Sequence, residues 1–125
     1  MHSFDETPLN RALGFQLRSL TDGRAEIAMP IQPWFFQENG IVHGGVITSL
    51  ADTASVYAAG GPKGMVGIEF KLNFLKAAAP DGAELVARAS IVRKGRTIAV
   101  SEVDVFQRDD RIATGLFTFL ILTSS

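Results

Sequence analysis

A single carboxylate stands in a long stretch of uncharged residues. Between Asn39 and Pro62 the only formally charged side chain is that of Asp52, although average charge density would place about five charged residues in a run of this length. An isolated ion in apolar surroundings loses several kcal/mol of hydration, and active sites are where such a cost is tolerated. Asp52 is therefore the candidate catalytic group.

The residues around Asp52 predict that it lies on a helix. The segment from Gly44 to Ala59 is long enough for four helical turns, and Gly60, Gly61 and Pro62 form a strong stop signal. Small polar residues share the face of Asp52 because they lie three or four positions away. They are Thr48, Ser49 and Ser55. In the alternative interpretation Asp52 is a buried acid that Thr48, Ser49 or a basic residue satisfies.

The start of the same helix carries a second group that could act on a carbonyl. Gly44 and Gly45 follow His43, and glycines let the backbone approach a ligand closely. The free N–H groups of a first helical turn can polarise a carbonyl oxygen. Alternatively, the glycines only form a tight turn that His43 caps. With Asp52 nine residues after His43, we favour a site that combines a backbone donor with a carboxylate.

The segment from Gln37 to Gly45, followed by residues 49–54, resembles the signature of hotdog-fold acyl-CoA thioesterases. The branch it resembles is the phenylacetate-degradation type, which is similar to the Arthrobacter-type 4-hydroxybenzoyl-CoA thioesterases. Asn73 to Lys76 and Ala79-Pro80 extend the resemblance. It implies an α+β hotdog fold, in which an antiparallel sheet wraps around the long helix. It also implies hydrolysis of acyl-CoA thioesters with aryl or medium-chain acyl groups, without a cofactor or metal.

The resemblance implies roles for individual residues. Asp52 matches the catalytic carboxylate, which acts as nucleophile or as general base on water. The backbone amide of Gly44 matches the donor to the thioester carbonyl, and Gln37 matches the residue that places the thioester or the water. His43 matches the motif histidine that supports local geometry. In the family, the carboxylate and the amide come from different subunits, so the resemblance implies a homodimer and favours a homotetramer.

Further residues are candidates for contact with the substrate. They are Gly45, Asn39, Ser49, Ser55, Trp34, Phe36, Arg93 and Lys94. The aromatic pair could line the acyl pocket or pack at a subunit contact. Arg93 and Lys94 could meet the phosphates of coenzyme A or belong to a solvated hairpin tip. Gly67 departs from the family, because many relatives carry Ser or Thr there. This departure gives weight to the alternative of a non-catalytic acyl-CoA-binding module.

The remaining elements must position this helix. We predict a short helix from Thr7 to Leu13, with Thr7 as its N-cap. Alternating apolar and polar residues predict strands at residues 68–74 and 97–107. Turn signals at residues 21–23, 94–96 and 108–110 delimit further strands at 15–20, 24–30, 83–93 and 111–122. The strand with Ile68, Phe70, Leu72 and Phe74 on one face should be half-buried. The last four strands should form a meander, and so apolar a helix needs a wrapping sheet or a second subunit.

Composition excludes several classes of function. The chain of 125 residues suits a single domain spanning 1–125. Without Cys and with only two His, it has no material for disulfides, zinc ribbons, thiol nucleophiles or a metal held by several imidazoles. A net charge of −1 argues against a nucleic-acid partner. Polar residues interrupt the apolar run, which argues against a membrane span, and the missing secretory signal favours a cytoplasmic location.

Overall fold

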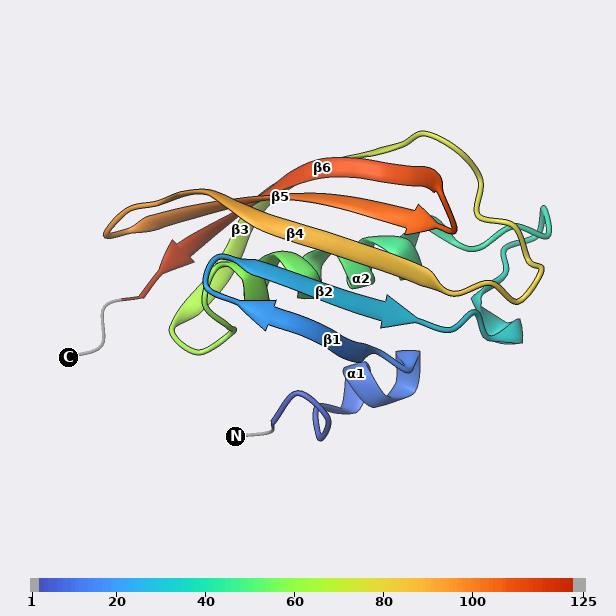
Figure 1. Ribbon diagram of the computed structural model, residues 1–125, viewed down its shortest axis with the longest axis horizontal. Coiled ribbons are helices and arrows are strands. Elements are labelled where there is room, and N and C mark those ends of the chain that lie inside the picture. The colour runs from blue at the N-terminus through green and yellow to red at the C-terminus, as the bar shows by residue number, and fades with distance from the viewer. Residues whose placement is uncertain (1–2, 123–125) are drawn as a thin grey trace.

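The computed structural model describes residues 3–122 (Figure 1). Its elements, in chain order, are α1 (Pro8–Leu13), β1 (Gln16–Thr21), β2 (Arg24–Met29), a 3-10 turn η1 (Pro33–Phe35), α2 (Gly44–Ala58), β3 (Met65–Phe74), β4 (Leu85–Lys94), β5 (Ile98–Gln107) and β6 (Asp110–Ile121). Every predicted helix and strand is present, and only η1 was not predicted. No helix in residues 3–122 is long and apolar enough to cross a membrane.

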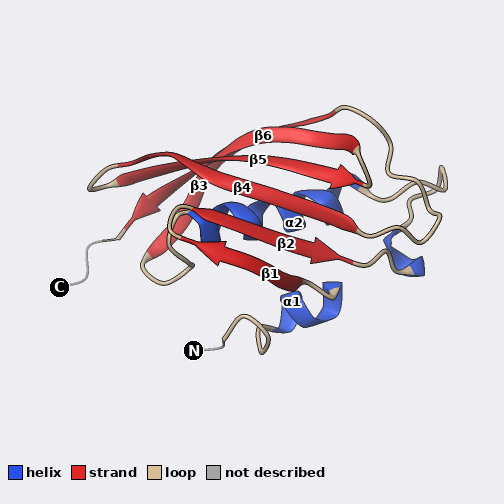
Figure 2. Ribbon diagram, viewed as in Figure 1, coloured by secondary structure: helices blue, strands red, loops and turns tan. Residues whose placement is uncertain are grey.

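The six strands form one antiparallel sheet in the order β1-β2-β4-β5-β6-β3. Helix α2 lies against one face of this sheet and packs mainly on β2, β4 and β5 (Figure 2). The other face carries charged and polar side chains such as Glu26, Arg88 and Glu102. This arrangement confirms the predicted α+β hotdog fold, in which a curved sheet covers a long helix.

Small and branched apolar residues hold α2 against the sheet. Ala51 and Ala54 on the helix are fully buried, and so is Leu50 between them and the strands. Ile27 of β2 and Val103 of β5 are buried on the opposite side of this contact. Burying a Leu or Ile side chain contributes about 1.5–3 kcal/mol relative to leaving it exposed. Because alanines let helix and sheet approach closely, α2 is a rigid platform for the side chains on its other faces.

The predicted four-strand meander is wrong in one connection. Strand β3 pairs with β6, whereas β4 pairs with β2 and β5. Residues 75–84 carry the chain from one edge of the sheet to its middle, and this segment contains Pro80 and a left-handed Gly82 with φ +87°. Pro80 has no N–H for a ladder, so a tight hairpin does not form there. Only β4, β5 and β6 make a meander, with the predicted turns at residues 94–96 and 108–110.

The predicted N-cap of α1 is confirmed in its position, although its side chain makes no capping hydrogen bond. The helix begins at Pro8, and Thr7 occupies the N-cap position, but its side chain caps no helical N–H. Instead, the Thr7 hydroxyl donates to the carbonyl oxygen of Ser3 at 2.9 Å. The hydroxyl is drawn back to this upstream turn, which competes with the cap.

Strand β3 is not half-buried as the alternation predicts. A bulge at Ile68, between Gly67 and Glu69, shifts its register against β6. Beyond the bulge, Phe70 and Phe74 face the helix side of the sheet, yet they are 54% and 53% exposed. The reason is that β3 is an edge strand, and α2 packs mainly under the strands in the middle. The protomer therefore leaves an apolar sheet edge uncovered.

Candidate active site

His43 is the N-cap residue of α2. Its Nδ1 accepts a hydrogen bond from the backbone N–H of Gly45 at 2.8 Å. An accepting Nδ1 carries no proton, so this contact fixes the neutral tautomer with its proton on Nε2. A Cβ at Gly45 would lie 3.0 Å from Nδ1, so a side chain there would crowd the cap. His43 therefore caps the helix, as the alternative interpretation predicts. The backbone N–H of Gly45 is already hydrogen-bonded to this cap.

The amide of Gly44 is a free donor at the same helix end. Within residues 3–122 its N–H donates to no acceptor, because it is the first N–H of the helix. The ring of Phe74 from β3 lies directly beside it, and a Cβ at Gly44 would be 3.2 Å from that ring. The positive end of the helix dipole points outward at this amide. An oxygen placed here would meet a preorganised donor next to an apolar wall.

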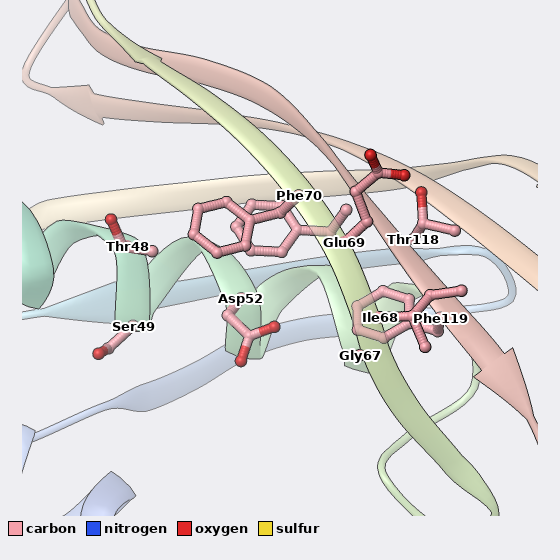
Figure 3. A pocket seen from close by; sticks show the side chains of 10 residues that line it. Thr48, Ser49, Asp52, Gly67, Ile68, Glu69, Phe70, Thr118 and Phe119 are labelled. Atoms are coloured by element: carbon pink, nitrogen blue, oxygen red, sulfur yellow. The ribbon is translucent and has the colours of Figure 1, made fainter.

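Asp52 lies near the middle of α2 and opens into a cavity of 570 Å³ between α2, β3 and β6 (Figure 3). The lining residues come from these three elements. They are Thr48, Ser49, Asp52, Gly67, Ile68, Glu69, Phe70, Phe117, Thr118 and Phe119. The aromatic rings of Phe70 and Phe117 stack with centroids 4.8 Å apart. The cavity therefore joins the Asp52 carboxylate to a wall that carries three phenylalanines and Ile68, and Glu69 is a second lining carboxylate.

The Asp52 carboxylate has no fixed partner. Among the described residues it makes no hydrogen bond and no ion pair. Its side chain is exposed through the open mouth of the cavity, but the surrounding protein removes part of its hydration. This desolvation raises the pKa of Asp52 above its ordinary value. A carboxylate that is both unpaired and made more basic is suited to attack a carbonyl or accept a proton from water.

The neighbouring hydroxyls do not satisfy Asp52. Thr48 donates to the carbonyl oxygen of Gly44 at 2.8 Å, and Ser49 donates to that of Gly45 at 3.0 Å. Their protons are therefore used within the helix, and only their oxygen lone pairs face the cavity. The structure thus contradicts the alternative in which Asp52 is a buried acid paired with these side chains.

Ser55 lies on a different face from the one predicted. It is fully buried, does not line the cavity, and its Oγ has no hydrogen-bond partner among the described residues. Its carbonyl oxygen accepts the hydroxyl of Ser101 from β5 at 2.9 Å. A residue three positions along a helix is rotated about 60° from the first, and this rotation turns Ser55 toward the sheet. The predicted substrate contact through Ser55 does not fit this position.

The loop before α2 gathers the predicted residues Trp34, Phe36, Gln37 and Asn39. Phe36 forms an isolated β-bridge with Val42, and the backbone N–H of Gln37 donates to the carbonyl oxygen of Ile41 at 2.9 Å. Trp34 is 59% exposed, and its Nε1 donates to the side chain of Gln32 at 2.9 Å. None of these residues lines the cavity at Asp52. They lie with Gly44 at the start of the helix.

The predicted cations lie at the opposite end of α2. The ammonium of Lys94 donates to the carbonyl oxygen of Ala59 at 2.7 Å, where it satisfies the end of the helix. Arg93 beside it is exposed. The predicted site residues therefore occupy the start, the middle and the end of one helix. Gly44 and Asp52 are eight residues apart, which corresponds to about 12 Å along the axis, so a single chain does not bring them to one reacting carbon.

The aromatic wall was missed by the sequence interpretation. Phe117 and Phe119 of β6 and Phe70 of β3 face the cavity. The signal was present as the two-residue alternation of both strands, but the pairing of β3 with β6 was needed to combine them. Within the described part of the chain, no three His, Asp or Glu side chains come together as metal ligands do.

Comparison with known proteins identifies the family and agrees with the fold. A family model described as the thioesterase superfamily matches residues 39–114. A solved structure of a thioesterase family protein from Silicibacter pomeroyi is 30% identical, with a TM-score of 0.86 over 97% of this chain and 93% of that one. A variant of the phenylacetic acid degradation protein PaaI from Thermus thermophilus is 27% identical, with a TM-score of 0.87 over 92% and 99%. A medium/long-chain acyl-CoA thioesterase of Salmonella typhimurium, YigI, is 27% identical over 91% of this chain and 85% of its own.

Proposed function

Because this chain belongs to the thioesterase superfamily and is a thioester hydrolase, we propose that it cleaves acyl-CoA thioesters of aryl or medium-chain acids to the free acid and coenzyme A. The observation that carries the proposal is the unpaired carboxylate of Asp52 in a cavity with an apolar wall. A non-reacting acyl-binding pocket would not need a partly desolvated ion, which costs free energy to keep. The apolar side chains of the wall suit an acyl group.

In this proposal each catalytic group has one task. The Gly44 amide donates to the thioester oxygen and stabilises the negative charge that develops on it. Asp52 either attacks the carbonyl carbon itself or takes a proton from the attacking water. If Asp52 attacks, the C–S bond breaks and leaves a mixed anhydride on Asp52, which water then cleaves to the free acid and the restored carboxylate; the departing thiolate takes a proton from solvent. If Asp52 takes the proton of the attacking water, the C–S bond breaks directly to the free acid, and Asp52 passes that proton to the departing thiolate. Gln37 would orient the thioester or the water, and His43 would hold the turn that presents the amide.

We propose that two subunits form this site. The separation of about 12 Å along the axis between Gly44 and Asp52 is too long for one carbonyl group to contact both from a single helix. The uncovered edge of β3 supports a second subunit, because it combines free strand N–H and C=O groups with exposed Ile68, Phe70 and Phe74. Association at this edge would bury the apolar surface and bring a partner helix close to the cavity. A homodimer is the smallest assembly that completes the site, and dimers would pair into a homotetramer.

A thiol-release assay over a panel of acyl-CoA thioesters tests the activity. We expect free coenzyme A to appear at a rate proportional to protein concentration, fastest for aryl or medium-chain acyl groups. Equilibrium binding of the same compounds should be measured in parallel. Protein that binds acyl-CoA but releases no thiol above background would be a binding module, and the hydrolase proposal would fail.

Mixed subunits test the shared site. Gly44→Pro removes the N–H donor at the first helical position, where proline is tolerated, and His43 before it already has the extended φ −61° and ψ 133° that proline favours. Gly44→Ala is the matched control, because it crowds Phe74 similarly but keeps the N–H. Equal mixing of Gly44→Pro with Asp52→Ala should give about a quarter of wild-type activity, since half of the dimers then carry one intact site of two. Activity no higher than that of either variant alone would exclude a shared site.

A further inference from the structure

Gly67 occupies the wall of the cavity beside the candidate catalytic carboxylate. It lies on β3, pairs with Phe119 of β6, and precedes the bulge at Ile68. Asp52 and Gly67 line the same cavity, and Figure 3 shows Gly67 on the β3 ribbon across from the helix that carries Asp52. Whatever fills the space at Gly67 therefore lies in the same cavity as the Asp52 carboxylate.

The backbone does not require glycine at this position. Gly67 is not among the glycines with positive φ, and a Cβ built on it would meet only ring carbons of Phe119 at 3.8 Å, an ordinary contact distance. Gly115 on the neighbouring strand is different, because a Cβ there would lie 2.0 Å from the carbonyl oxygen of Lys71. Gly115 is needed for the close approach of two strands. At Gly67 a side chain fits, so the consequence of glycine is the open space it leaves.

We propose that Gly67 is a specificity-determining residue, and that the space above it accepts a substituent on the acyl carbon next to the thioester carbonyl. This inference rests on the proposed function. If Asp52 attacks the carbonyl carbon or directs water to it, the groups nearest to Asp52 contact the adjacent acyl carbon and not the far end of the chain. The ring of Phe119 lies beside this space, and Ile68 and Phe117 add apolar surface to the same cavity, so the substituent it suits is a methyl branch or the edge of a ring.

The size of the effect follows from the size of the space. One methyl or methylene group in an apolar enzyme pocket changes kcat/KM by about 10-fold to 200-fold. A Cβ at Gly67 would occupy the space of one such group. Gly67→Ala should therefore lower kcat/KM for branched substrates more than for straight-chain substrates, which do not use the space. Gly67→Val should extend the discrimination because it fills more of the cavity.

The experiment compares acyl-CoA isomers that have the same number of carbons, one straight and one with a methyl branch on carbon 2, such as butyryl-CoA and 2-methylpropanoyl-CoA. For wild-type protein we expect kcat/KM values within about tenfold of each other. In Gly67→Ala the ratio of kcat/KM for the branched isomer to kcat/KM for the straight isomer should fall at least tenfold. Ser90→Thr is the matched control, since it adds one methyl group on the outer face of the sheet, where Ser90 contacts Glu102; its ratio should equal that of wild type.

Two results would overturn the inference. One is a wild-type protein that rejects the branched isomer by much more than tenfold, a result that needs no variant to fold. The other is a ratio in Gly67→Ala and Gly67→Val that matches wild type while both variants keep the wild-type melting temperature. Neither result is the failure of the proposed function, which would appear instead as no thiol release from any substrate by wild-type protein.

Discussion

Replacement of Gly115 by alanine should separate the two strands that carry the wall of the cavity. A Cβ at this position would lie 2.0 Å from the carbonyl oxygen of Lys71 and 2.9 Å from the Cα of Leu72. Both neighbours belong to the backbone of β3, so no side-chain rotation relieves the overlap. The strands must move apart by more than 1 Å, roughly the difference between these contacts and an ordinary one.

The expected cost follows from the hydrogen bonds that such a movement breaks. Two or three ladder bonds near Leu72 would stretch beyond their normal length, at about 1 kcal/mol each, and overpacking adds to this. A loss of about 3 kcal/mol corresponds to a fall in Tm of about 12 °C for a domain of this size. Because β3 carries Gly67 and Phe70, thiol release from straight and branched substrates should fall together.

Thermal unfolding followed by circular dichroism measures this effect. Gly67→Ala is the matched control on the same strand pair, because its Cβ would meet Phe119 at an ordinary 3.8 Å. We expect its Tm to equal or slightly exceed that of wild type, since replacing glycine reduces the entropy of the unfolded chain. A Tm for Gly115→Ala within about 2 °C of wild type, or an equal loss in Gly67→Ala, would refute the geometric reasoning.

Four further predictions concern α2. Because the carboxylate of Asp52 is the active form and burial raises its pKa, kcat/KM should rise with pH through an inflection above the ordinary aspartate value; an inflection below that value would contradict this. The same raised pKa means that the folded protein loses stability as Asp52 ionises, so Asp52→Asn should raise Tm at neutral pH and leave it unchanged in acid. His43→Ala should lower the free energy of unfolding by about 1 kcal/mol, because it removes the acceptor of the Gly45 amide. His43→Asn keeps an acceptor and should retain most of this stability. Lys94→Met should lower the free energy of unfolding by about 1 kcal/mol, because it removes the hydrogen bond to the end of the helix. Arg96→Met, at an exposed position, should leave Tm unchanged in thermal unfolding.

Local patterns in the sequence were sufficient for most of the fold. The stop signal at Gly60 and Gly61 predicted the end of α2 within one residue, because both glycines adopt positive φ there. Two-residue alternation is clearest in the strands in the middle of the sheet, such as β5, because one face of these strands is buried under α2. The pairing of β3 was not predictable in this way. It depends on contacts between residues far apart in the chain, such as Phe70 with Phe117, and on a bulge that leaves no local signal at Ile68.

Of the predicted site residues, Asp52 and Ser49 line the cavity, whereas the others lie elsewhere along α2 or next to its ends. Asp52 stood out because no other charge is near it in the sequence, and its position in a cavity with an unpaired carboxylate agrees with that interpretation. Ser55 was placed on the wrong face because helical spacing alone does not say which of the small polar residues around Asp52 turns toward the sheet. The distance between Gly44 and Asp52 follows from helix geometry, but its consequence for subunits needed the exposed edge of β3 as well.

The most direct test of the central claim is thiol release by Asp52→Asn, measured under single-turnover conditions with a good acyl-CoA substrate. Asparagine keeps the shape of the side chain but neither attacks the thioester nor accepts a proton from water. Asp104→Asn, on the outer face of β5 and paired with Arg111 at 3.5 Å, is the matched control that removes one carboxylate elsewhere. We expect Asp52→Asn to lose at least about 100-fold in rate while its oligomeric state and substrate affinity stay close to wild type, and Asp104→Asn to keep full activity. Turnover by Asp52→Asn at the wild-type rate would show that Asp52 is not the catalytic carboxylate.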